Sequence, residues 1–175
     1  MYLPKADSIF ESIKKIEPGT CLIKDFEKKT TIQKKFFNFS FNPQTNIKKE
    51  EWKEQIFETF QSSLDRWSMS DCPYTCSLSG GLDSSAIVAL LSQMNKKVNT
   101  FSLGFKDLQD SRYNELENAR IISQKYQTNH TEVMLDANIL INDLEKITYH
   151  MDEPYGGGVP SWLLFEKISK NYKVV

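Results

Sequence analysis

Apolar residues recur at two different spacings along this chain, and the alternation of these spacings predicts an α/β fold. Three short apolar runs have the length and composition of buried strands, at 74–78, 98–103 and 131–135. Each is followed by a segment that predicts a helix: residues 86–91 are apolar on every side, and 115–126 and 136–151 have apolar residues at helical spacing. Strands that alternate with helices of about 10–15 residues are typical of a parallel sheet with helices on both faces.

The last residues continue this alternation. Aspartate and serine often precede helices because their side chains accept hydrogen bonds from the free N–H groups of the first turn. We therefore expect Asp136 to cap the helix over 136–151, and Ser161 to cap a further helix that runs through Ile168. A fourth strand is then expected to begin at 172–175.

The residues before 74 follow another pattern, which predicts a β-hairpin and one long helix. Residues 8–13 are expected to form a short helical turn, and strand-like runs at 20–24 and 30–37 flank a polar turn. A lone hairpin is marginally stable in water, so we expect this one to belong to a larger sheet. The segment 48–67 predicts an amphipathic helix, and we expect its apolar stripe to be core: Trp52, Ile56, Phe60 and Leu64.

The stretch with the most chemical content follows the first strand of the predicted sheet. It consists of Ser79, Gly80, Gly81, Leu82, Asp83, Ser84 and Ser85, and we call it the 79–85 loop. The first N–H groups of a helix have no internal partner, and the helix dipole adds about half a positive charge there. A glycine pair lets an anion approach this backbone closely, so the loop indicates a phosphate-binding site.

Asp83 is unexpected in such a loop, because a carboxylate repels a bare phosphate. A cation between the two groups removes this conflict, and Mg²⁺ commonly binds one or two carboxylates together with phosphate oxygens. We therefore expect Asp83 to hold Mg²⁺. The alternative is an ordinary helix start, with aspartate in the first turn and a serine as its cap.

The residue pattern of the loop differs from two common phosphate-binding motifs. It contains neither the Gly-x-x-x-x-Gly-Lys-Ser/Thr pattern of the Walker loop nor the Gly-x-Gly-x-x-Gly pattern of dinucleotide-binding domains. It resembles the pyrophosphate loop of the ATP pyrophosphatases, and most closely that of the glutamine-hydrolysing asparagine synthetase family. The phrase Ile-Lys-Lys-Ile-Glu-Pro-Gly-Thr at 13–20 is similar to the end of the glutaminase domain in the same family.

This resemblance implies an ATP-dependent ligase. A carboxylate, aspartate in this family, would be activated by ATP as an acyl-adenylate with release of pyrophosphate, and ammonia from glutamine would then displace AMP. ATP and Mg²⁺ are the implied cofactors, and a homodimer of the longer protein is compatible with the family. β-Lactam-forming and peptide-cyclising relatives are similar at this loop and remain alternatives, as does an inactive fragment that only binds nucleotide.

The resemblance also assigns roles to single residues. The positions of Leu78 and Leu103 contact adenine through their backbone in the family, with Gly104 next to the second of them, although Leu103 could equally be a plain core residue. Asp152 and Glu153 resemble the segment that lines the acceptor side of the site; an ordinary helix end explains them equally well.

The same resemblance predicts the domain organisation. Residues 1–41 would be the end of a glutaminase-type domain, 42–73 a linker and an amphipathic helix, and 74–175 the first part of an ATP-binding synthetase domain. The family's glutaminase nucleophile is a cysteine at the mature N-terminus, where this chain has Tyr2. We therefore expect a fragment that is inactive alone, because the family's second acidic loop would follow Val175.

Composition narrows the remaining classes. The net charge of −1 and the scattered lysine pairs argue against nucleic acid or an anionic membrane as a main partner. Three cysteines without a signal peptide favour a reducing, cytoplasmic compartment, and we expect Cys21 and Cys76 to be buried thiols. Two histidines leave little room for a zinc site, and we expect His130 to lie at the solvent edge rather than to act as a base.

Overall fold

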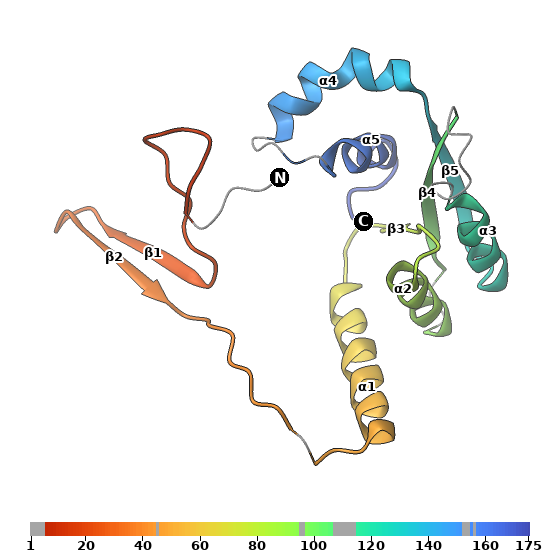
Figure 1. The fold of residues 1–175 in the computed structure, drawn as a ribbon, viewed down its shortest axis with the longest axis horizontal. Helices are drawn as coiled ribbons and strands as arrows, with labels where there is room; N and C mark the ends of the chain where they lie inside the picture. The colour runs from red at the N-terminus through yellow and green to blue at the C-terminus, as the bar shows by residue number, and fades with distance from the viewer. Residues whose placement is uncertain (1–5, 45, 95–96, 107–114, 152–154, 156) are drawn as a thin grey trace.

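The computed structural model describes residues 6–44, 46–94, 97–106, 115–151, 155 and 157–175, without the side chains of 137, 139 and 140. A three-stranded parallel sheet forms the centre of its second half (Figure 1). Its strands, in spatial order, are β3 (Cys76–Ser77), β4 (Asn99–Phe105) and β5 (Asn129–Leu135). On the outer side of β3, Val174 forms a parallel bridge to Tyr74, where a fourth strand was expected to begin.

Helices cover both faces of this sheet, as the alternation of apolar runs predicts. On one face lie α2 (Leu82–Gln93) and α3 (Leu116–Lys125), whose side chains pack around the fully buried Leu78 and Val88. On the other face, Phe101 of β4 packs against Leu164 and Ile168 of α5 (Gly158–Ile168). Helix α4 (Ala137–Met151), which precedes α5 in the chain, joins this second face through the fully buried Ile147.

Two helix starts differ in how well the sequence predicted them. Asp136 precedes α4 and its carboxylate accepts a hydrogen bond from the backbone N–H of Asn138 at 2.8 Å, which confirms the predicted cap. The prediction for Ser161 was wrong, because α5 already begins at Gly158. Ser161 lies inside the helix, where its hydroxyl donates to the carbonyl of Gly157 at 3.3 Å.

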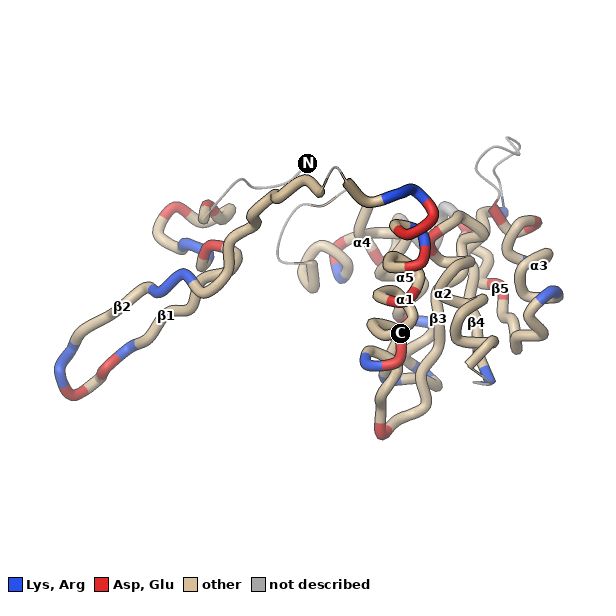
Figure 2. Tube along the Cα trace, turned by 90° about the horizontal axis from the view of Figure 1, so that it is seen from below, with Lys and Arg blue, Asp and Glu red and all other residues tan. Residues whose placement is uncertain are grey.

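The front part of the chain contains the predicted hairpin. Strands β1 (Thr20–Asp25) and β2 (Thr30–Lys35) pair in antiparallel register and extend away from the α/β unit (Figures 1 and 2). The Asp25 carboxylate accepts the N–H groups of Glu27 and Lys28 at 3.0 and 2.9 Å, which closes the turn. Residues 8–13 form bends and turns instead of the expected helical turn, because the Ser8 hydroxyl bonds the local backbone at Phe10 and Ile13.

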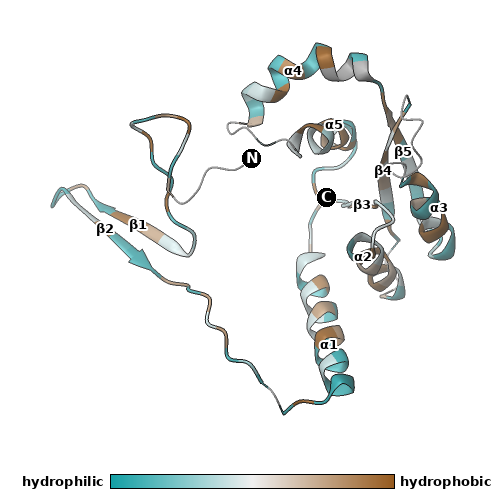
Figure 3. Ribbon diagram, viewed as in Figure 1, coloured by the Kyte–Doolittle hydropathy of each residue, from teal (hydrophilic) through white to brown (hydrophobic). Residues whose placement is uncertain are grey.

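The long helix α1 (Lys49–Trp67) forms where the amphipathic pattern predicts it, but the expectation that its stripe is core was wrong. No residue of α1 is buried; Ile56 is 63% exposed and Trp67 is 87% exposed. The reason is that α1 contacts α2 along a short stretch only, so apolar residues remain on its open side (Figure 3). Among the described residues, no helix is both long enough and apolar enough to cross a membrane.

Two further side chains differ from expectation in their burial. Cys76 is buried, and burial raises the pKa of its thiol to about 11, whereas Cys21 is only partly buried. The side chain of His130 is 11% exposed, so its predicted place at the solvent edge was wrong. Its Nδ1 lies 2.8 Å from the hydroxyl of Thr100, which in turn lies 2.8 Å from the hydroxyl of Thr128.

Burial of His130 predicts a loss of stability in mild acid. Its Nε2 atom is buried without a hydrogen-bond partner, and burial lowers the pKa of the ring below its ordinary 6.5 although Glu132 acts in the opposite direction. Below about pH 6.5 the unfolded chain therefore takes up a proton that the folded chain resists, and the free energy of unfolding falls as the pH drops.

Urea unfolding of the wild type and of His130→Gln, at about pH 7.5 and about pH 5.5, measures this effect. The wild type should lose stability between the two values and the variant should lose less, since glutamine does not titrate. Arg120 holds the pKa of Glu132 below its usual 4.5, so this carboxylate acts only at lower pH. Equal losses in the two proteins would show that His130 does not cause the dependence.

Candidate functional site

The 79–85 loop joins β3 to α2, and the hydroxyl groups of two of its serines form hydrogen bonds within the loop. The Ser79 hydroxyl accepts the N–H of Gly81 at 3.2 Å and lies 3.1 Å from the hydroxyl of Ser84. The Ser84 hydroxyl also accepts the N–H of Ser79 and bonds the carbonyl of Gly81, both at 3.3 Å. The loop is therefore held in one shape by its own hydroxyl groups.

Helix α2 begins inside this loop, at Leu82, four residues earlier than the apolar run suggested. Its first internal hydrogen bond runs from the N–H of Ser85 to the carbonyl of Gly81 at 3.1 Å. The N–H groups of Leu82, Asp83 and Ser84 precede that bond, and no side chain caps the helix. Gly81, Leu82 and Asp83 are exposed, so this positive helix end is open to solvent.

The two glycines of the loop have different roles. Gly80 has a φ of +81°, and a Cβ built there would lie 2.6 Å from Cβ of Asn118 and 2.7 Å from the backbone nitrogen of Ala119. The close approach of α3 thus explains why residue 80 is a glycine, whereas the sequence interpretation explained it by the close approach of a ligand. At Gly81 the same construction meets only the Ser79 hydroxyl, at 3.3 Å, so Gly81 is the glycine on the open side.

A cavity of about 340 Å³ opens beside the loop, at the carboxyl ends of β3 and β4. It brings together three residues that the sequence assigned to the site, namely Leu78, Ser79 and Leu103. Ligands of open α/β sheets bind at this edge. The remaining lining comes from β3, β4, the start of α3 and α5: Ser77, Phe101, Ser102, Phe105, Glu115, Pro160 and Leu164.

The backbone of Leu103 faces this cavity, whereas that of Leu78 is largely used inside the sheet. The N–H of Leu78 donates to the carbonyl of Phe101 at 2.8 Å, and its carbonyl accepts the hydroxyl of Ser102, which leaves one lone pair. Peptide groups of alternate residues in a strand point to the same side. The peptide groups of Leu103 therefore point toward β3, like those of Phe101. Because β3 ends at Ser77, no residue of β3 pairs with Leu103.

Gly104, which was also predicted to belong to the site, is not among the described residues that line the cavity. Gly104 is buried on the opposite face of β4, where a Cβ would collide with Leu116 Cδ1 and lie 2.8 Å from Met134 Sδ. Its small size is thus a packing requirement. Asp152 and Glu153 lie outside the described residues.

Sequence reasoning missed three polar residues of the cavity, Ser77, Ser102 and Glu115. Among the described residues that line the cavity, Glu115 is the one that carries a charge. Glu115 directly precedes α3, the helix that follows β4 in the chain. Polar residues between a sheet strand and the next helix often line a ligand site, and this position could have identified Glu115 from the sequence. Among the described residues, no three His, Cys, Asp or Glu side chains form a metal-binding group, so Asp83 would need ligand oxygens to hold a cation.

These features define an α/β protein with an open helix N-terminus and a cavity at the carboxyl ends of parallel strands. The asparagine synthase family model matches residues 55–175, and the chain belongs to this family. The loop and the phrase at 13–20 therefore indicated the correct family.

Individual relatives agree. Asparagine synthetase [glutamine-hydrolyzing] 1 of Bacillus subtilis is 23% identical over 99% of this chain and 27% of its own length. A putative asparagine synthetase [glutamine-hydrolyzing] 2 of Methanocaldococcus jannaschii is 27% identical over 99% of the chain and 34% of its own length. Asparagine synthetase of Zea mays is 30% identical over 54% of the chain and 17% of its length. The chain thus spans about a third or less of these relatives.

Proposed function

We propose that this chain binds ATP, with the two outer phosphates at the 79–85 loop and adenine in the adjacent cavity. The observation that carries the proposal is the uncapped, exposed start of α2, which lies directly beside the cavity that Ser79 and Leu103 line. N–H groups at a helix start bind anions through hydrogen bonds and through the helix dipole. The N–H and carbonyl of Leu103 fit the hydrogen-bonding edge of adenine.

The reaction that fits this arrangement is the ATP-dependent amidation of aspartate. An oxygen of the side-chain carboxylate attacks the α-phosphorus of ATP, the α–β phosphoanhydride bond breaks, and pyrophosphate leaves. Ammonia then attacks the acyl carbon of the resulting adenylate, AMP leaves, and asparagine forms after loss of a proton. The loop would serve the first step by positioning the outer phosphates and stabilising the charge that develops on them.

Asp83 is the residue that would hold Mg²⁺, which is the second implied cofactor. It is exposed in the first turn of α2, next to the N–H groups that would bind phosphate. Mg²⁺ would reduce the repulsion between this carboxylate and the phosphates.

The chain corresponds to only part of the length of its relatives. We propose that residues 74–175 form the first portion of the synthetase domain, and that 42–73 contain a linker and α1. Residues 1–41 would come from the end of a domain that releases ammonia from glutamine. The second candidate function is nucleotide binding without turnover, at the same loop and cavity.

Calorimetric titration of the chain with ATP, AMP and GTP in the presence of Mg²⁺ tests the proposal. ATP should bind roughly 10-fold or more tightly than AMP, because AMP lacks the phosphates that the loop would hold. GTP should bind more weakly than ATP, because guanine reverses the donor and acceptor that Leu103 would meet. Equal affinity for ATP and AMP, or no binding of ATP, would contradict the proposal.

A further inference from the structure

The carbonyl of Leu78, where β3 gives way to the 79–85 loop, accepts a hydrogen bond from a side chain of the neighbouring strand. The donor is the hydroxyl of Ser102, and both residues are buried. The N–H of Leu78 donates to the carbonyl of Phe101 at 2.8 Å, as in an ordinary parallel pair. The chain at Leu78 is thus joined to β4 by one backbone bond and one side-chain bond.

A regular parallel ladder would use another donor at this carbonyl. The register of β3 and β4, continued by one residue, places Leu78 opposite Ser102. In a parallel ladder a residue bonds the two neighbours of the residue opposite it: its N–H donates to the first, and its carbonyl accepts the N–H of the second. The carbonyl of Leu78 would thus accept the N–H of Leu103, but it accepts the hydroxyl of Ser102. Among the described residues, no backbone hydrogen bond joins Leu103 to Leu78, and the N–H of Leu103 is left at the cavity that this residue lines.

We propose that Ser102 is a positioning residue of the candidate nucleotide site, which keeps the N–H of Leu103 free to donate to adenine. Its hydroxyl occupies the carbonyl that would otherwise pair with this N–H, so the ladder between the two strands ends one bond early. The free donor would meet the ring nitrogen N1 of adenine, which accepts a hydrogen bond. The inference rests on the proposed function for the identity of the ligand, whereas the effect of Ser102 on Leu103 is measurable without nucleotide.

Replacement of Ser102 by alanine should let the ladder close. The buried carbonyl of Leu78 would lose its donor, and a buried carbonyl without a hydrogen bond destabilises the folded chain. The N–H of Leu103 is the donor that the ladder pattern offers to this carbonyl, so a new backbone bond should form. Leu103 would then be paired within the sheet, and adenine would lose its donor.

Amide hydrogen exchange of the isotope-labelled chain without nucleotide tests this closure. Exchange of the Leu103 amide should be roughly 10-fold slower, or more, in Ser102→Ala than in the wild type. The Leu78 amide is the internal reference for a general change of stability, because its N–H already bonds Phe101 in the sheet. A scalar coupling across the hydrogen bond, between the Leu103 nitrogen and the Leu78 carbonyl carbon, should be present in the variant only.

Calorimetric titration in the presence of Mg²⁺ tests the consequence for the nucleotide. Ser102→Ala should bind ATP roughly 10-fold more weakly than the wild type, the effect expected when one hydrogen bond to the ligand is lost. Its affinity for pyrophosphate should be unchanged, because pyrophosphate has no adenine and would meet only the 79–85 loop.

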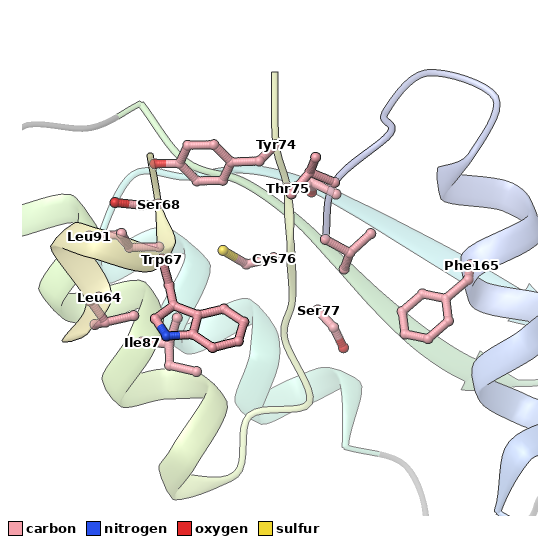
Figure 4. A pocket seen from close by; sticks show the side chains of 12 residues that line it. Leu64, Trp67, Ser68, Tyr74, Thr75, Cys76, Ser77, Ile87, Leu91 and Phe165 are labelled. Carbon is pink, nitrogen blue, oxygen red and sulfur yellow. The ribbon is translucent and has the colours of Figure 1, made fainter. Parts of the chain in front are cut away.

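Thr75→Val is the matched control, because it removes another buried hydroxyl that joins β3 to β4. The Thr75 hydroxyl donates to the carbonyl of Asn99 at 2.8 Å. Figure 4 shows Thr75 and Ser77 along β3, beside a hollow on the outer side of the strand. Ser77 also borders the nucleotide cavity, whereas Thr75 is not among the described residues that line this cavity. Thr75→Val should therefore bind ATP with the affinity of the wild type.

The inference is overturned if Leu103 exchange in Ser102→Ala equals that in the wild type, if this variant binds ATP with wild-type affinity, or if Thr75→Val weakens ATP binding as much. A wild type that binds no ATP would refute the proposed function instead. Leu103 exchange would still decide whether Ser102 controls this N–H.

Discussion

Replacement of Gly80 by alanine should destabilise the chain by about 2–4 kcal/mol, the sum of a left-handed backbone penalty and an overpacking penalty. The φ of +81° is a conformation that side chains with a Cβ rarely adopt. The new methyl group would also collide with the backbone of α3 at Ala119, 2.7 Å away, which cannot move aside as a flexible side chain can. Both effects raise the free energy of the folded state.

Gly81→Ala is the matched control, since it adds the same atom one residue later. There φ is −70°, and the nearest neighbour is the Ser79 hydroxyl at 3.3 Å, so the stability change should stay within about 1 kcal/mol. Urea unfolding of the two variants measures the difference. If both glycines tolerated alanine equally, the close contact between the loop and α3 would be refuted.

Replacement of Asp83 by alanine should weaken binding of ATP in the presence of Mg²⁺ by roughly 10-fold or more, the effect expected when a charged ligand of the ion is lost. Without Mg²⁺ the sign should reverse, because the variant no longer places a carboxylate beside the phosphates. Opposite changes in ATP affinity with and without Mg²⁺ would distinguish a role in metal binding from a general loss of folding.

Glu50→Ala provides a control for Asp83→Ala, because Glu50 is also an exposed acidic residue in the first turn of a helix, α1. Titrations of both variants with ATP, with and without Mg²⁺, should show a change for Asp83 and none for Glu50. An Asp83→Ala protein with wild-type affinity under both conditions would remove Asp83 from the site.

Elements whose borders depend on local chemistry were predictable from the sequence. The turn that Asp25 closes and the helix start that Asp136 caps depend on hydrogen bonds within three residues. The stripe of α1 shows the limit of this reasoning. Helical spacing predicts an apolar face, but whether that face is buried depends on the surface opposite it, and among the described elements α1 makes its main contacts with α2.

The candidate site also has features with a local sequence signal and features without one. The 79–85 loop could be recognised because its residues are consecutive, and the proposal that it binds an anion was drawn from the expected helix start alone. The role of Gly80 depends on Asn118 and Ala119, which are more than thirty positions away along the chain. Burial of His130 depends equally on Thr100 of a neighbouring strand, so neither contact has a local signal.

An NMR titration of the labelled chain with pyrophosphate and Mg²⁺ tests directly whether the start of α2 binds phosphate. We expect the backbone amide signals of Leu82, Asp83 and Ser84 to shift together and saturably, while those of the β1–β2 hairpin do not move. Phosphate binding at this helix start is refuted if its signals remain unchanged while pyrophosphate binds elsewhere, or if pyrophosphate does not bind.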